Sequence, residues 1–197
     1  MSLVRQWTSA KIEGVSVPAE PLAGLVVLAN HDPVQRNVRA GRPLKIGQQE
    51  FTRGLYCHAT SRIHVRLPQP ARAFTALVGV DHNSDTSGGR GSVVFSVSVG
   101  GQEKFHSSVM RGGEPGVAVN VDLDGASDFL LDISDAGDGI ACDQADWADA
   151  KVTLSDGTDL WLGEMALIDE QEAPISTDPY FSFVYDGEPS ATLLSHW

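Results

Sequence analysis

The feature that most constrains this chain is an alternation of apolar and polar residues with a period of two. Between Arg62 and Leu67, the apolar residues Ile63, Val65 and Leu67 alternate with charged or polar ones. Successive side chains of a β-strand point to opposite faces, so this pattern predicts a strand with one buried and one wet face. The same alternation recurs around 93–99, 117–123 and 129–133. The chain therefore contains several such strands in series.

Shorter apolar stretches and glycine-bearing turns complete the pattern. Further strands are expected at 44–46, 73–80, 102–109 and 150–154, which gives about eight or nine short strands, a number typical of two packed sheets. Three dipeptides join apolar runs in the manner of tight antiparallel hairpins: Gly100-Gly101, Asp124-Gly125 and Asp156-Gly157. We therefore predict an all-β fold, an antiparallel β-sandwich with antiparallel connections throughout.

The composition of the chain changes near its C-terminal end. Residues 169–179 are polar, acidic and proline-bearing, and indicate a linker after a single module over 1–168. Residues 180–197 begin with a strand-like aromatic run but are too few to build a core, so we interpret them as the truncated start of a following region. The alternative is a tail strand that docks back onto the sandwich.

The charge of the chain narrows the class of ligand. Its 14 basic and 26 acidic residues give a formal net charge of −12. This charge repels polyanions, so nucleic acid, anionic lipid and sulfated glycan are disfavoured and a neutral or cationic ligand is favoured. No apolar run approaches the length of a membrane span, and no secretion signal is visible at the start.

The densest polar segment is an acidic one that lies between 135 and 149. Carboxylates this close repel one another, so they are gathered by a hard cation such as Ca²⁺, satisfied by backbone amides and Arg, or turned to solvent. The candidate calcium ligands are Asp135, Asp138, Asp143 and Asp146. The histidines show no metal-ligand spacing, which argues against a histidine-built metal enzyme.

One aromatic residue and two loops are candidates for recognition. Trp147 could cover the apolar face of a sugar ring, or it could be a buried cap on the sandwich. The polar, glycine-rich stretches at 82–91 and 111–116 either recognise a ligand at the edge of a rigid scaffold or simply connect strands. Neither loop has the pattern of a phosphate-binding loop.

Four ordered motifs resemble a known family. They are Phe51 to Ile63 (FTRGLYCHATSRI), Phe74 to Asp81 (FTALVGVD), Gly91 to Phe95 (GSVVF), and Asp135 to Gly139 (DAGDG) followed by DQADWADA. Together they are similar to the NPCBM family of carbohydrate-binding modules over about residues 14–163. The resemblance implies a galactose-binding-domain-like jelly roll that is non-catalytic and is appended to a glycoside hydrolase such as an alpha-galactosidase. It also implies that the parent protein is secreted, periplasmic or on the cell surface.

The resemblance also suggests a ligand and the residues that bind it. The expected partners are neutral galactosides or N-acetylgalactosaminides and a catalytic domain in the same chain. His58 is placed near the Asp146 segment, either donating to one of its acids or contacting the ligand, and Cys57 is placed close enough to Cys142 for a disulfide, with two separate thiols as the alternative. The expected carbohydrate-binding residues are His58, Asp81, His82, Asn83, Arg111, Gln144 and Trp147. The chain departs from the usual family pattern at Cys57, Cys142 and Gln144.

Two other functional classes stay open on the sequence alone. The chain has abundant acids but no pair singled out by pattern, so an independent glycosidase is less favoured. A structural or protein-interaction sandwich is a third alternative, because similar folds host unrelated functions.

Overall fold

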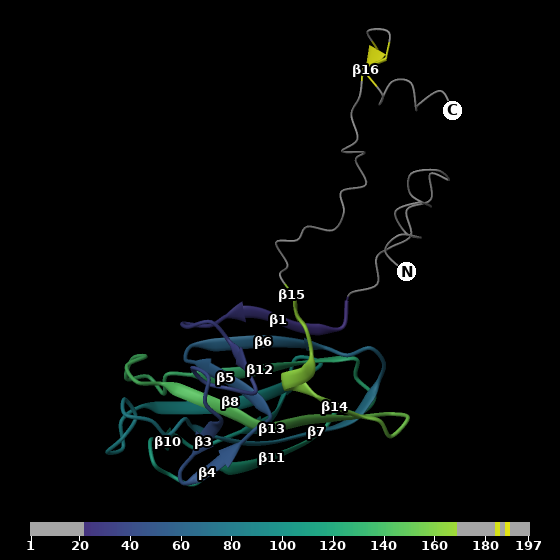
Figure 1. The fold of residues 1–197 in the computed structure, drawn as a ribbon. Helices are drawn as coiled ribbons and strands as arrows, with labels where there is room; N and C mark the ends of the chain where they lie inside the picture. The colour runs from purple at the N-terminus through teal and green to yellow at the C-terminus, as the bar shows by residue number, and fades with distance from the viewer. Residues whose placement is uncertain (1–21, 169–183, 186–187, 190–197) are drawn as a thin grey trace. The chain divides into compact units, whose positions relative to one another are not determined.

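Two β-sheets face each other across a hydrophobic core (Figure 1). The structure is a computed structural model that describes residues 22–168, 184–185 and 188–189. Residues Leu22–Asp169 form one compact unit. Within the described residues, no helix has the length and apolar character needed to cross a membrane. The all-β sandwich predicted from the alternating pattern is confirmed.

The first sheet has seven strands in the order β10-β8-β12-β6-β1-β15, with β9 also paired to β8. The strands are β1 (Gly24–Ala29), β6 (Ser61–Arg66), β8 (Ser92–Val99), β9 (Gln102–His106), β10 (Met110–Arg111), β12 (Asp128–Ser134) and β15 (Leu167–Ile168).

The second sheet has six strands in the order β11-β7-β13-β5-β2, with β14 also paired to β13. The strands are β2 (Gln35–Arg36), β5 (Gly54–His58), β7 (Ala71–Val80), β11 (Val117–Asp122), β13 (Gln144–Leu154) and β14 (Asp159–Trp161), and a single 3-10 turn, η2 (Leu162–Glu164), follows them.

The core between the sheets is built from the inward-facing residues of the alternating strands. Ile63 and Val65 of β6 and Phe95 of β8 are fully buried, as the period of two requires. From the other sheet, Phe74 of β7 and Trp147 of β13 meet them, and the rings of Phe95 and Trp147 pack edge to face with centroids 5.1 Å apart.

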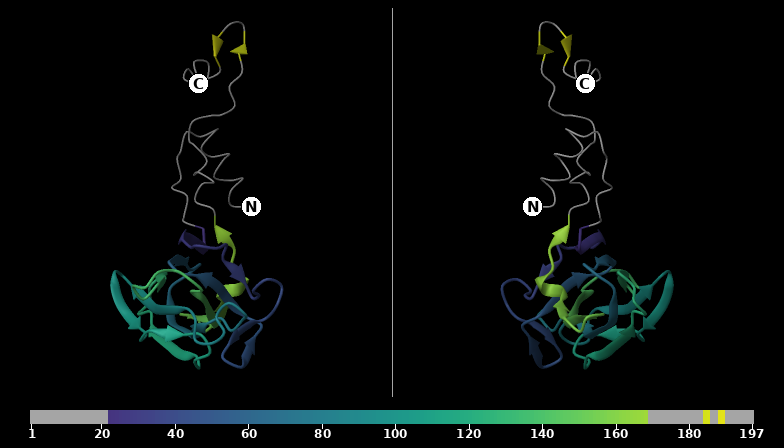
Figure 2. Two further views of the ribbon diagram at one scale, coloured as in Figure 1. Left: turned by 90° about the vertical axis from the view of Figure 1, so that its left-hand side faces the viewer. Right: turned by 90° about the vertical axis from the view of Figure 1, so that its right-hand side faces the viewer.

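A small hairpin covers part of the outer face of the six-stranded sheet. It consists of β3 (Leu44–Ile46) and β4 (Gln49–Phe51), and Figure 2 shows it in blue at one margin of the sandwich. Leu44, Ile46 and Phe51 form a second buried cluster with Tyr56 of β5. The middle of this sheet is therefore buried on both faces, which explains why all five residues of β5 are buried.

Two expectations about connectivity are wrong. The dipeptide Asp124-Gly125 joins β11 to β12, but these strands pair in different sheets, so the turn is a crossover and not a hairpin. A turn dipeptide specifies a local reversal but not the partner strand. The connections are also not antiparallel throughout, because β1 and β15 are parallel, with Leu25 opposite Leu167. The hairpins at Gly100-Gly101 and Asp156-Gly157 are confirmed.

The predicted linker at 169–179 lies outside the described residues. Of the predicted following region, the structure describes only β16 (Val184–Tyr185) and β17 (Glu188–Pro189), which pair with each other in antiparallel fashion.

Candidate functional site

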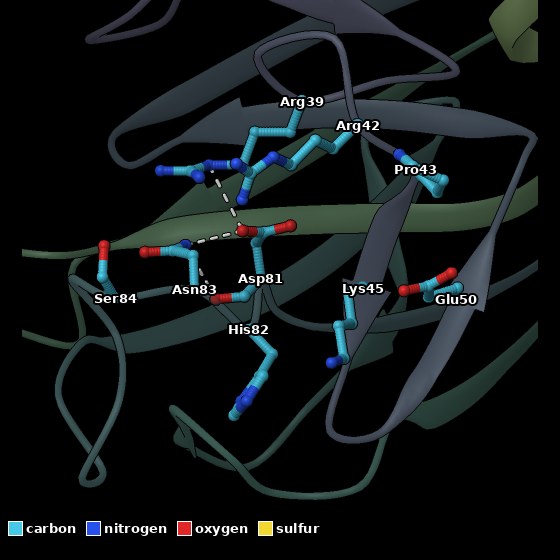
Figure 3. A pocket seen from close by; sticks show the side chains of 9 residues that line it. All are labelled: Arg39, Arg42, Pro43, Lys45, Glu50, Asp81, His82, Asn83 and Ser84. Carbon is cyan, nitrogen blue, oxygen red and sulfur yellow. Dashed lines mark hydrogen bonds and ion pairs between the residues drawn. The ribbon is translucent and has the colours of Figure 1, made fainter.

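A polar pocket of about 360 Å³ lies between the segment that leads into the β3–β4 hairpin and the loop that follows β7 (Figure 3). Its volume is at the small end of the range of ligand pockets, which suits a ligand of one or two sugar rings. The pocket is lined by Arg39, Arg42, Pro43, Lys45, Glu50, Asp81, His82, Asn83 and Ser84.

A tight turn places the two arginines of the pocket. Arg39 and Arg42 form a bridge in which each backbone N–H donates to the other's carbonyl, at 2.8 and 2.9 Å. The two residues between them, Ala40 and Gly41, both have positive φ, at 48° and 76°, as a two-residue turn of the primed type requires. Residues directly opposite in such a ladder project to the same face, and Figure 3 shows both arginine side chains extending toward Asp81.

Arg39 is held by a network from three segments of the chain. Its Nε lies 3.2 Å from Oδ1 of the buried Asp81, and one terminal nitrogen donates to Oε1 of Gln144 at 2.6 Å. The Asn83 side-chain amide donates to Asp81 Oδ1 at 2.6 Å and to Gln144 Oε1 at 2.7 Å. The guanidinium also lies 5.4 Å from the ring centroid of Tyr56. These contacts join Arg39, Asp81, Asn83 and Gln144 into one network, which we call the floor of the pocket and expect to be rigid.

Below this floor lies a second carboxyl group, that of Asp146 on β13. Desolvation by burial, followed by the nearby charge of Asp81, raises the pKa of Asp146 well above its ordinary value. Asp146 Oδ2 accepts from the backbone N–H of Lys45 at 3.2 Å. The Lys45 carbonyl in turn accepts from the backbone N–H of His82 at 2.6 Å, so the buried acid fixes the hairpin against the loop after β7.

Of the predicted site residues, the structure brings four together. Asp81, His82 and Asn83 line the pocket, and Gln144 supports it through Arg39 and Asn83. His82 Nδ1 is buried and has no hydrogen-bond partner among the described residues. Arg111, by contrast, lies outside the pocket lining, and its exposed loop closes on itself through Glu114.

Of the two alternatives for Trp147, the buried cap is the one observed. Trp147 is fully buried between the sheets, so its ring cannot cover a sugar face. Because side chains alternate along β13, the neighbours of the outward-facing Asp146 point into the core. His58 lies beside the Asp146 segment, as the resemblance implied, because β5 pairs with β13 and places His58 opposite Gln144. It is buried, its Nδ1 lies 2.9 Å from the Ala59 carbonyl oxygen, and its ring packs against that of His31. Its contact with a ligand stays a prediction.

The four predicted calcium ligands do not come together. Asp146 lies with Asp81 under the pocket, whereas Asp143 accepts from the backbone N–H of Ser92 at 2.7 Å and Asp138 accepts from the Ser92 hydroxyl. Burial and the charge of nearby Asp138 raise the pKa of Asp143, and its Oδ2 is buried without a partner in the described part of the chain. Among the described residues, no group of three or more potential ligands is placed to hold a metal ion.

The predicted disulfide is also absent. Cys57 and Cys142 are both free, and Cys57 is fully buried. The alternative of separate thiols is therefore the one observed. Burial raises the pKa of the Cys57 thiol to about 12, so this thiol is unreactive.

Sequence reasoning missed the basic side of the pocket. Arg39, Arg42 and Lys45 were not singled out, although Ala40-Gly41 between two arginines is a turn signal and Lys45 is the polar residue in the alternating strand Leu44–Ile46. The contact between this segment and the loop after β7 joins residues far apart in the sequence, and no local pattern reports it.

Comparison with known proteins identifies relatives of the module. The family model described as the NPCBM/NEW2 domain matches residues 24–153. A Renibacterium salmoninarum protein named as a putative endo-alpha-N-acetylgalactosaminidase is 38% identical over 117 residues, which is 58% of this chain and 7% of that protein. The chain therefore spans only a small part of this curated relative.

Two solved modules have the same fold. The CBM51 of Clostridium perfringens GH95 in complex with methyl-galactose superposes with a TM-score of 0.59 at 25% identity, covering 64% of this chain and 92% of that one. The CBM51-2 and INT domains of Clostridium perfringens ZmpB, with CBM51-2 in complex with GlcNAc, superpose with a TM-score of 0.59 at 26% identity, covering 64% of this chain and 28% of that one.

Proposed function

Because the chain belongs to the NPCBM/NEW2 domain family, whose members are non-catalytic carbohydrate-binding modules of glycoside hydrolases, we propose that its pocket binds a terminal galactose-type sugar. The observation that carries this proposal is the rigid polar floor of Arg39, Asp81, Asn83 and Gln144 within a small, open pocket. The expected ligand is galactose or N-acetylgalactosamine at the end of a glycan.

The chemistry of the pocket suits a hydroxyl-rich ring. Sugar hydroxyls both donate and accept hydrogen bonds, and the pocket presents a carboxylate, an amide and guanidinium groups to them. Because these groups are already held by one another, little entropy is lost when they bind. An epimer whose hydroxyl points the other way leaves one of these polar side chains without a hydrogen bond and therefore binds more weakly. Such a site thereby distinguishes an axial from an equatorial hydroxyl.

The relatives support galactose over other sugars without agreeing fully. The name of the Renibacterium relative and the methyl-galactose complex point to galactose-type sugars, whereas the ZmpB module binds GlcNAc. The parent protein of this chain is expected to be a glycoside hydrolase that acts on such glycans outside the cytoplasm.

Titration calorimetry with galactose, N-acetylgalactosamine, glucose and GlcNAc tests the proposal. We expect dissociation constants of about 0.1 to 1 mM for the galactose-type sugars, because a single ring offers few atoms to a shallow site. Glucose, which differs from galactose only at the axial hydroxyl, should bind more weakly. A preference for GlcNAc over both galactose-type sugars, or no binding of any sugar, would contradict the proposal.

Two variants locate the site. Asn83→Ala removes the amide that joins Asp81 to Gln144 and should weaken galactose binding about tenfold or more, because it leaves both partners short of a hydrogen bond. Lys104→Gln is the control, since Lys104 lies outside the pocket and pairs with Asp124 at 3.7 Å. Equal binding by the two variants would move the site elsewhere.

A further inference from the structure

We propose that the sugar taken by this pocket carries an anionic substituent, a carboxylate or a sulfate ester, and that Arg42 and Lys45 bind that substituent. This inference rests on the proposed function, because the sugar ring itself is held by the floor of Arg39, Asp81, Asn83 and Gln144. It goes against the expectation from the net charge of −12, which favoured a neutral ligand.

The first argument is the placement of like charges. Arg39 and Arg42 stand directly opposite each other across the turn, and like charges in that position destabilise a hairpin. Asp81 lies 3.2 Å from Arg39 and Asp85 3.7 Å from it, so the first arginine is neutralised within the protein. The side chain of Arg42 forms no hydrogen bond or ion pair with any described residue, and a ligand anion would relieve the repulsion.

The second argument is that Asp146, the acid below the floor, does not pair with the side chain of Lys45. Asp146 is buried and accepts from the backbone N–H of Lys45, and no ion pair joins its carboxyl group to the Lys45 ammonium group in the described part of the chain. Lys45 is half-buried beside the pocket, and its backbone is fixed on both sides by Asp146 and His82. Lys45 lines the pocket, and its ammonium group forms no ion pair with a described acid.

The pocket lining contains two acids, Asp81, which pairs with Arg39, and Glu50. Glu50 is the cross-strand partner of Lys45 in the β3–β4 hairpin, but it is exposed and forms no ion pair within 4 Å with a described residue. An exposed pair of this kind contributes little and is readily exchanged for a ligand. Three basic and two acidic side chains line the pocket, an excess opposite in sign to that of the whole chain.

The test compares matched sugars with the intact protein. Calorimetry is performed with methyl galactoside, galactose 6-sulfate and methyl galacturonoside at low and high salt, and the last two distinguish a sulfate from a carboxylate. We expect at least one anionic sugar to bind about fivefold more tightly than the neutral one at low salt, and the difference to shrink as salt screens the charges.

Three variants complete the design. Arg42→Gln should abolish the gain from the anionic group, measured within this variant as the ratio of its affinities for the anionic sugar and for methyl galactoside. Glu50→Gln should increase the gain, and Lys104→Gln should leave it as in the unmodified protein.

The outcomes separate the two proposals. Binding of methyl galactoside with no tighter binding of either anionic sugar overturns this inference and leaves the proposed function standing. Binding of an anionic sugar alone supports the inference and overturns a neutral galactose site. If no sugar binds, this inference and the proposed function are both overturned. If the tighter binding of the anionic sugar survives Arg42→Gln, a different group binds the anion and the role of Arg42 is overturned.

Discussion

At the scale of single residues, the sequence shows which segments carry polar or aromatic side chains, but it does not show which of these side chains lie in the pocket and which in the core. Asp81, His82 and Asn83 follow a clear strand, so a polar loop at the sheet edge could be predicted. Trp147 stands among acids in the sequence but points into the core, because one residue of shift along a strand reverses the face. The net charge of −12 describes the whole chain and does not report the local arrangement of Arg39, Arg42 and Lys45 around the pocket.

Asp146 gives a prediction about pH. Its pKa is raised in the folded state, so the folded protein retains a proton that the unfolded chain releases above about pH 4. Its contribution to stability is therefore fully present below that pH and is lost as the pH rises toward the folded-state pKa. Asp146→Asn keeps the shape and can donate to Asp81 without titrating, so its melting temperature should fall less between about pH 4.5 and 8.

Thermal melting of both proteins across this range provides the measurement. The difference between the two profiles isolates Asp146, because Asp143, whose pKa is also raised, is present in both. Parallel profiles would show that Asp146 does not hold the extra proton.

At the scale of elements, the strands could be predicted because alternation and burial obey the same period. The strand at Val117–Asp122 and that at Asp128–Ser134 were placed correctly, yet their partners were not, since a turn between them does not say which sheet the chain enters next. The pairing depends on which faces meet in the core, a property of the whole set of strands.

The close approach of β5 to β13 provides a prediction at this scale. Gly54 has φ +136°, and a Cβ there would lie 2.2 Å from the Trp147 carbonyl oxygen. Gly54→Ala should therefore lower the free energy of unfolding by about 2 to 4 kcal/mol, through overpacking and backbone strain together. The control is Gly88→Ala, which has φ +74° but open space around the new methyl group, and it should cost only about 1 kcal/mol.

Urea denaturation of the two variants measures both costs. A similar loss at Gly54 and Gly88 would mean that β5 and β13 separate to admit the methyl group.

At the scale of the whole molecule, a cation bound to the acidic loop before β13 would raise the stability of the folded state. We keep a structural Ca²⁺ as a proposal on a reduced ligand set of Asp135, Asp138 and Asp143. Asp143 Oδ2 is buried and has no partner among the described residues, and burial followed by the charges of Asp138 and Asp135 raises the pKa of Asp143. The three carboxylates are not gathered in the described part of the chain, so binding would require the loop to close around the ion.

If calcium binds the folded state, it stabilises the entire sandwich by mass action. Added calcium should raise the melting temperature of the intact chain, and a chelator should lower it again. Asp138→Asn should remove the response, whereas Asp122→Asn, on β11, should leave it intact. An unchanged melting temperature in calcium and in chelator, with no metal found by elemental analysis, would end this proposal.

The parallel pairing of β1 with β15 has a mechanical consequence. These strands are the first and the last of the sandwich, and Leu25 lies opposite Leu167 in the same direction of travel. Tension passed along the chain would pull β1 and β15 in opposite directions along their length, so the bonds between them would be strained together and not one after another. Behind them, β1 is also paired with β6 from Gly24 to Ala29. A chain pulled at both ends would thus load this pair in shear, the direction in which paired strands resist separation best.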